Sequence, residues 1–306
     1  MNKQNPSNPL LCDVATGICG TEPSGDFAGT EMAGADKPLQ IIYFTDPICS
    51  ACWGIEPQLR KLKLEYGNLF EIQYCMGGLL PSWDGFSSGG ISSPADVAGH
   101  WDEAGDYYQM PIDGDVWLED PLPSSFPPSV AVKAAQLQGD DKGVAFLRKI
   151  RELLYLQKYN ICRWEYLLEA AADVGLDTDQ FTEDFNHRAQ QLFESDLELS
   201  HRLGVRGFPT LIIGDREGNT RVINGYQPYE RFEQIILTLC QGAEKREYSR
   251  SEEGVFTHYN TLTTKEYAVL TGVDFRVADQ CLNDLFREGR VRRYHANKGD
   301  LWSAPN

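Results

Sequence analysis

Two cysteines stand three positions apart in the segment Cys49-Ser-Ala-Cys52. They follow the apolar, β-prone run Leu39–Thr45 and open a pattern of apolar residues that predicts a helix up to about Tyr66. Cys49 is therefore expected at a helix N-terminus, where unpaired N–H groups and the helix dipole stabilise an anion and lower a thiol pKa. Cys52, one turn further on, is placed to resolve a mixed disulfide. The pair predicts thiol–disulfide exchange with Cys49 as the nucleophile.

Two other interpretations of the pair compete with redox chemistry. A structural zinc site usually needs a second cysteine pair or a histidine pair nearby, whereas the chain has no second Cys-x-x-Cys segment and no histidine before His100. Two inert, buried thiols are the other alternative. We therefore expect no metal and no organic cofactor. The expected partners are a disulfide-containing protein or peptide and a cellular dithiol reductant or oxidant.

The elements around the pair predict one mixed sheet interrupted by helices. Strand, helix and strand over 39–75 form a βαβ unit, whose crossover is expected to be right-handed. Helical patterns follow from 129 to 203, and the last of them, over 179–203, is expected to break near residue 186. A β-hairpin over 209–224 precedes a closing helix over 229–240. This order predicts an α/β fold in which a helical block over about 90–203 is inserted into the sheet domain.

Composition predicts four parts along the chain. Residues 1–37 are polar and rich in Pro, Ser and Gly, which is typical of a flexible tail. The α/β domain is expected over 38–241 and a charged linker over 242–254. Two helical patterns and a short hairpin over 255–306 resemble a winged-helix module.

The neighbourhood of the cysteines resembles the thioredoxin superfamily, and in particular its DsbA family. Asp46-Pro-Ile-Cys-Ser-Ala-Cys-Trp-Gly54 is similar to the start of a cytoplasmic DsbA-like group of protein-disulfide isomerases. Pro57 stands where the superfamily has a helix-kinking proline. The resemblance covers roughly 39–241 and implies a thioredoxin-like sheet with a large helical insertion. It also implies a thiol–disulfide oxidoreductase or isomerase, although Tyr43 occupies the place of the buried acid of DsbA.

A second segment, Gly204-Val-Arg-Gly-Phe-Pro209-Thr, resembles the cis-proline loop of the same superfamily. A cis bond before Pro209 would turn the backbone of Phe208 outward, where it could pair with a substrate strand. A trans proline at the start of a strand is the alternative. Trp53, directly after the second cysteine, is expected to be half-exposed and to line the substrate groove, or else to pack in the core. The resemblance thus implies substrate binding by Phe208, Pro209 and Trp53.

The helix after the cysteines carries a competing resemblance. The run from Trp53 to Gly67 is similar to a segment of the SpxH/YjbH adaptors, DsbA-fold proteins that deliver a transcription factor to the ClpXP protease. Adaptor members can carry a His-rich N-terminal segment, which is absent from residues 1–99 here. This resemblance implies a binding protein with little or no redox catalysis. We take redox catalysis as the main prediction and the adaptor as its alternative.

The remaining cysteines and tryptophans have less specific interpretations. Cys12 and Cys19 would close a loop in the tail, as a built-in substrate, as a redox sensor, or as thiols without consequence. Trp83, Phe86 and Trp101 are expected in the core of the insertion rather than on a peptide-binding surface. Four further cysteines are expected as core thiols: Cys75, Cys162, Cys240 and Cys281.

Charge excludes some classes of partner. The formal net charge is −17, so an average negative field opposes binding to nucleic acid or to an anionic membrane. The expected wing of the C-terminal module is locally basic, but acids occupy its would-be recognition helix, which favours docking to protein over binding to DNA. No apolar run is long enough to span a membrane, and no signal peptide is visible, so we expect a cytoplasmic protein.

Overall fold

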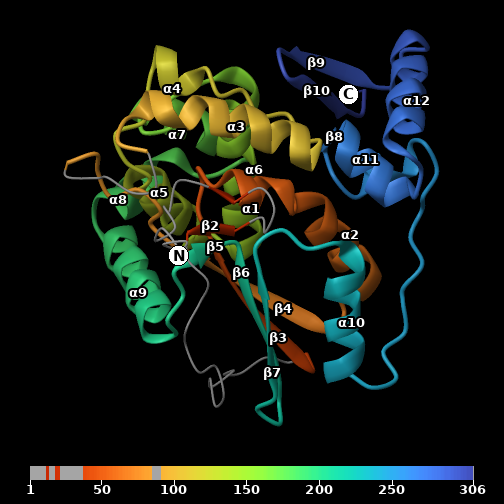
Figure 1. Cartoon of the computed structure of the whole chain (residues 1–306), viewed down its shortest axis with the longest axis horizontal. Helices are drawn as coiled ribbons and strands as arrows, with labels where there is room; N and C mark the ends of the chain where they lie inside the picture. The colour runs from red at the N-terminus through yellow and green to blue at the C-terminus, as the bar shows by residue number, and fades with distance from the viewer. Residues whose placement is uncertain (1–11, 14–17, 21–36, 85–90, 306) are drawn as a thin grey trace, which may run out of the picture.

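The computed structural model describes residues 12–13, 18–20, 37–84 and 91–305 (Figure 1). Its main sheet has the strand order β4-β3-β6-β7, in which β3 runs parallel to β4 and antiparallel to β6. β3 is an inner strand of this sheet and is buried almost throughout, in agreement with its continuous apolar sequence. The strands are β3 (Leu39–Thr45), β4 (Phe70–Met76), β6 (Thr210–Asp215) and β7 (Thr220–Asn224).

The helical insertion lies between β4 and β6 in the chain and beside the sheet in Figure 1. The predicted α/β fold, thioredoxin-like with a large DsbA-like insertion, is confirmed. The long pattern over 179–203 is broken near residue 186, as expected. The helices are α3 (Pro94–Tyr108), α4 (Val116–Glu119), α5 (Phe126–Gln136), α6 (Asp140–Gln157), α7 (Trp164–Asp173), α8 (Thr178–Asn186) and α9 (Arg188–Arg202).

The helix that follows the cysteines is divided in two. α1 (Ser50–Gly54) ends at Ile55, and α2 (Glu56–Tyr66) begins with Pro57 in its first turn. Proline has no N–H and its ring clashes with the carbonyl four residues earlier, so it is tolerated only at the start of a helix. The apolar pattern predicts one helix up to Tyr66, and the proline explains the difference.

A second, small sheet involves the N-terminal residues. β1 (Cys12–Asp13) and β2 (Ile18–Gly20) pair antiparallel, and β2 pairs antiparallel with β5 (Gly207–Phe208). The sequence analysis predicted no strand here. Such short strands carry no periodicity of their own, and their pairing with β5 joins positions that are distant in sequence. The rest of the expected tail lies outside the described residues.

The C-terminal residues build a three-stranded antiparallel sheet with two helices, which Figure 1 shows in blue. The strand order is β8-β10-β9, and a separate apolar core gathers around Leu262, Leu282 and Trp302. Its identification as a winged-helix module, and the domain boundaries, remain predictions. The elements are β8 (Thr261–Thr263), α11 (Thr264–Thr271), α12 (Phe275–Arg287), β9 (Arg292–Ala296) and β10 (Gly299–Ser303), after α10 (Tyr229–Leu239) of the main domain.

A buried carboxylate ties this C-terminal part to the helices of the sheet domain. Glu266 of α11 is fully buried and accepts two hydrogen bonds from Arg148 of α6, at 2.7 and 3.0 Å, while Arg60 of α2 lies at 3.2 Å. The Thr263 N–H also donates to it and completes a capping box at the start of α11. Burial opposes ionisation, but Arg148 and Arg60 hold the pKa of Glu266 below its usual value.

The segment before the C-terminal part runs along the end of α2. Glu65 is fully buried there and accepts hydrogen bonds from Tyr229 and from Arg250, the latter at 3.0 Å. Lys245 lies 3.3 Å from the same carboxylate. This segment was expected as a charged linker, and its charges serve to fix it to α2. None of the described helices is long and apolar enough to cross a membrane.

Replacing Glu266 by alanine should strongly destabilise the protein. The substitution removes the carboxylate that Arg148 and Arg60 share and leaves them only Glu152 and Glu56, so the free energy of unfolding should fall by about 3 kcal/mol. Urea unfolding followed by circular dichroism measures this change. Glu288→Ala is the control, because Glu288 is an exposed partner of Arg290 and its loss should cost at most about 1 kcal/mol. Equal losses in the two variants would contradict the role given to Glu266.

Candidate functional site

Cys49 is the N-cap residue of α1, at the end of the loop that follows β3. Its Sγ accepts a hydrogen bond from the Cys52 N–H at 3.1 Å, so a thiol takes the place of the usual capping oxygen. The expected position at a helix N-terminus is confirmed. Both cysteines are fully buried, together with the whole of α1.

Burial changes the expected acidity of the pair. The pKa of Cys49 is raised well above its usual value, first by loss of hydration and then by its hydrogen bond and charge interaction with Cys52. The prediction of a lowered pKa at Cys49 is therefore wrong, because desolvation outweighs the favourable N–H groups. At Cys52 burial acts in the same direction, but the hydrogen bond from Cys49 and the charge of Arg151 lower the pKa. Of the two thiols, Cys52 therefore has the lower pKa and is the one that ionises more readily.

Arg151 of α6 lies beneath the cysteine loop and is fully buried. It donates to Thr45 Oγ1 at 2.7 Å, to the Asp46 carbonyl at 3.0 Å and to Glu56 at 2.7 Å. It therefore joins the end of β3, the turn before Cys49 and the start of α2. Sequence reasoning missed this residue, since a lone arginine in a helix gives no signal of where its side chain will lie.

Asp46 forms the turn that carries the chain from β3 to Cys49. Its carboxylate accepts from the N–H groups of Ile48 at 3.0 Å and Leu79 at 2.7 Å, and from Ser125 Oγ at 2.9 Å. Complete burial nevertheless raises its pKa to about 6, because these bonds and Arg151 offset only part of the lost hydration. Asp46 thus anchors the cysteine loop to the loop after β4 and to the start of α5.

Trp53 is fully buried, so the expectation of a half-exposed groove residue is wrong. Its Nε1 donates to the Pro111 carbonyl at 3.0 Å, its ring stacks on Tyr155, and the Arg148 guanidinium lies 4.4 Å from the ring centroid. The alternative of simple packing is the one that the structure supports. Trp101 is also buried in this core, as predicted, and Trp83 packs against it, while Phe86 lies outside the described residues.

The bond between Phe208 and Pro209 is cis, as the sequence analysis expected. Both residues are buried. The Phe208 ring packs against Gly77, where any Cβ would collide with it, which explains the glycine in the loop after β4. Their expected role in binding a substrate strand remains a prediction.

The edge of β5, which was expected to bind a substrate strand, is already paired with β2 of the same chain. β2 pairs with β5 in the register Cys19 opposite Phe208 and Gly20 opposite Gly207. β2 also approaches α1, with Cα pairs within 8 Å. β2 also pairs with β1, and in that ladder Cys19 lies opposite Cys12. The N-terminal pair is therefore brought to the same region as Cys49 and Cys52.

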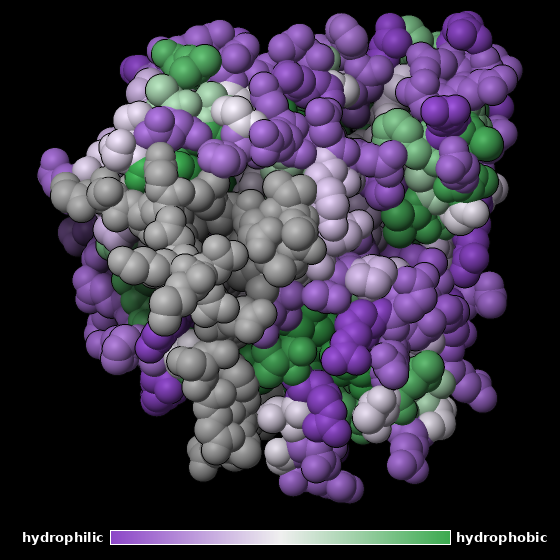
Figure 2. All heavy atoms as spheres, viewed as in Figure 1, coloured by the Kyte–Doolittle hydropathy of each residue, from purple (hydrophilic) through white to green (hydrophobic). Residues whose placement is uncertain are grey.

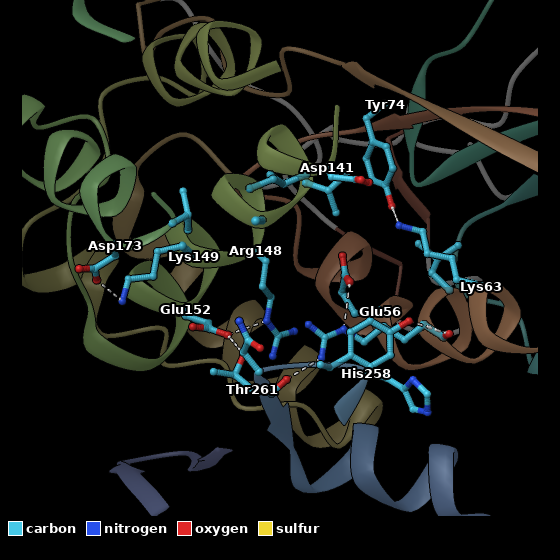
Figure 3. Close-up of a pocket in the computed structure, with 18 residues that line it drawn as sticks. Glu56, Lys63, Tyr74, Asp141, Arg148, Lys149, Glu152, Asp173, His258 and Thr261 are labelled. Atoms are coloured by element: carbon cyan, nitrogen blue, oxygen red, sulfur yellow. Dashed lines mark hydrogen bonds and ion pairs between the residues drawn. The ribbon is translucent and has the colours of Figure 1, made fainter. Parts of the chain in front are cut away.

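A separate cavity of about 620 Å³ lies between α2, α6 and the segment before β8 (Figure 3). Both of its lysines have a partner in the lining: Lys63 donates to the Tyr74 hydroxyl at 2.8 Å, and Lys149 lies 2.6 Å from Asp173. None of the residues that line it belongs to the predicted site.

Over the described part of the chain, no group of His, Cys, Asp and Glu side chains has the arrangement of a metal site. Cys75 is a buried core thiol, as predicted, and burial raises its pKa well above the usual range. Cys162, Cys240 and Cys281 are only partly buried.

Comparison with known proteins identifies the family. Residues 43–234 match a family model described as thioredoxin. The chain is 33% identical over 303 residues to the ClpXP adapter protein SpxH of Halalkalibacterium halodurans, covering 96% of this chain and 97% of that protein. The chain belongs to the SpxH family of thioredoxin-fold proteins. Another SpxH, from Shouchella clausii, is 32% identical over 294 residues, and the match covers 95% of this chain and 95% of that protein.

A solved structure extends the comparison to the fold. The cytosolic disulfide reductase DsbM of Pseudomonas aeruginosa superposes with a TM-score of 0.53 and is 25% identical, covering 66% of this chain and 100% of that one. The predicted resemblance to both the DsbA-like proteins and the SpxH adaptors is confirmed.

The prediction that the chain is an oxidoreductase or isomerase is wrong. The relatives that match nearly the whole chain are named adapter proteins and not enzymes. The site agrees with this correction in physical terms: Cys49 is buried and its pKa is raised, whereas a nucleophilic cysteine needs access and thiolate character.

The ionisation of Asp46 should make stability depend on pH. Its pKa of about 6 in the folded chain lies above the value of about 3.9 for an unfolded chain. A raised carboxyl pKa gives stability at low pH that is lost as pH rises through about 6. Relative to Asp46→Asn, the wild-type free energy of unfolding should therefore fall by about 2 kcal/mol from about pH 4 to about pH 7.5.

Urea unfolding of both proteins across this range measures the difference. Asp215→Asn is a suitable control, since Asp215 is only partly buried and its pKa is lowered rather than raised. A wild-type–Asp46→Asn difference that stays constant, or that grows with pH, would contradict the assignment.

Proposed function

We propose that this chain is an adaptor that binds a protein and presents it to the ClpXP protease. The observation that carries the proposal is the extent of the two similarities. The likeness to SpxH spans 96% of the chain, whereas the likeness to the disulfide reductase spans 66%. The adaptor similarity thus extends over about a third more of the chain than the likeness to that reductase.

The state of the cysteines supports this proposal. Disulfide exchange requires a thiolate that can approach a sulfur atom in line, and Cys49 is fully buried with a raised pKa. Binding a protein requires only an accessible surface. We therefore infer that the adaptor function does not depend on Cys49 or Cys52.

The C-terminal part supplies a surface suited to a protein partner. α12 exposes an apolar side chain, Val277 (54%), near its start, and Phe286 (39%) near its end lies on the opposite side of the helix. Figure 2 shows apolar side chains gathered in this region of a largely hydrophilic face. The α2 helix was the other candidate for the contact. It packs against both α10 and α11, and most of its apolar residues are buried.

Two basic residues of the expected wing, Arg290 and Lys298, are already paired with acidic side chains. Arg290 lies within 3.0 Å of both Glu253 and Glu288, and Lys298 lies 3.2 Å from Asp102. Phosphate binding relies on cations that are not already neutralised. The cytoplasmic location expected from the sequence fits a partner protease but remains a prediction.

A complementation experiment tests the proposal. In a Bacillus subtilis strain lacking its own SpxH, this chain should shorten the half-life of at least one protein severalfold, and only when ClpX is present. Pulse-chase mass spectrometry measures the half-lives. Cys49→Ala/Cys52→Ala should act like the wild type, because binding needs no thiolate. If that variant folds but loses all activity in this assay, or if no half-life depends on the chain, the proposal fails.

The contact surface can be tested with matched substitutions. Val277→Glu places a charge in the exposed apolar surface of α12 and should weaken partner degradation about tenfold or more, since a buried unpaired charge at an interface is costly. Leu118→Glu is the control, because Leu118 is equally exposed (59%) but lies on α4. The same assay measures both. Equal effects of the two variants would remove α12 from the proposed interface.

A further inference from the structure

The strand β2 lies where an extended peptide would bind in order to reach the cysteines. It pairs antiparallel with β5, directly before the cis proline, and it also approaches α1. Pairing of an extended segment with an exposed strand edge is a general mode of peptide recognition, with affinity supplied by main-chain hydrogen bonds. Here the chain itself supplies the extended segment.

The register of β2 on β5 shows how this strand lies relative to Cys49. Cys19 is opposite Phe208, and Gly20 is opposite Gly207. Cys49 caps α1, the helix that β2 approaches, and is fully buried. A strand that occupies the β5 edge next to α1 therefore stands between Cys49 and any extended segment of a partner that would pair with the same edge.

We propose that β2 is a built-in, displaceable cover of the Cys49–Cys52 pair, which occupies the strand-binding edge of β5. An extended segment of a partner pairs with β5, and thiol reagents reach Cys49, only after β2 has left. The proposal goes beyond the adaptor function and does not depend on it, because it concerns access to the cysteines in the isolated chain.

The connection to the rest of the chain allows this displacement. Two residue pairs join β2 to β5, and the local opening of so short a ladder costs far less than unfolding of the main sheet. Residues 21–38 separate β2 from β3. At about 3.3–3.6 Å per extended residue, a connection of this length lets β2 leave β5 while it stays attached to the chain.

Paired substitutions in the full-length chain test the cover. In an antiparallel ladder, successive residue pairs alternate between hydrogen-bonded and non-bonded, so one of the N–H groups of Cys19 and Gly20 belongs to the ladder. Cys19→Pro/Gly20→Pro removes both donors. Cys19→Ala/Gly20→Ala removes the same thiol but keeps both donors, and is the matched control.

The measurement is the rate at which iodoacetamide alkylates each cysteine of the reduced, folded protein, resolved by peptide mass spectrometry. We expect alkylation of Cys49 to be about tenfold or more faster in the proline variant than in the alanine variant, as local opening becomes frequent. Cys75, buried in β4, should stay unreactive in both. Equal rates at Cys49 would overturn the proposal. A parallel rise at Cys75 would overturn it too, because β2 would then support the whole fold and not cover one site.

Discussion

The buried contact between Glu266 and the arginines of α2 and α6 determines how the two parts of the chain fit together. A carboxylate with no exposure is tolerated only when charge and hydrogen bonds replace its lost hydration. Arg148 supplies a bidentate contact and Arg60 a second cation. Because Arg148 also lies over the Trp53 ring, the same guanidinium reaches from the C-terminal part to the helix that carries Cys52.

α6 therefore links two regions through residues one turn apart. Arg148 faces Glu266, while Arg151 holds Thr45, the turn at Asp46 and Glu56. Residues three apart on a helix lie on neighbouring parts of its surface, so one rigid element carries both cations. The position of the cysteine loop and the position of the C-terminal part are set by the same helix.

Local patterns predicted much of this fold, and non-local contacts account for what they missed. The apolar run of β3 and the break before α9 follow from nearby residues, as does the cysteine at a helix N-terminus. The burial of Trp53 was missed because it depends on Pro111 and Arg148, which are distant in sequence. The raised pKa of Cys49 was missed for the same reason: helix position predicts one contribution, but desolvation depends on everything that packs over the site.

The family motifs are present in this chain, but the residues packed around them determine whether the cysteines can react. The dithiol, the proline at the start of α2 and the cis proline are all present, and as a set they favour redox chemistry. A motif, however, specifies only which residue types are present, not whether they are accessible or ionised. Catalysis also needs a thiolate that is accessible, and here Arg151 and the hydrogen bond from Cys49 favour a charge on the buried Cys52. While β2 occupies the β5 edge these atoms are enclosed, and the surface proposed for the partner lies on α12. The fold of an oxidoreductase is in this way compatible with the work of an adaptor.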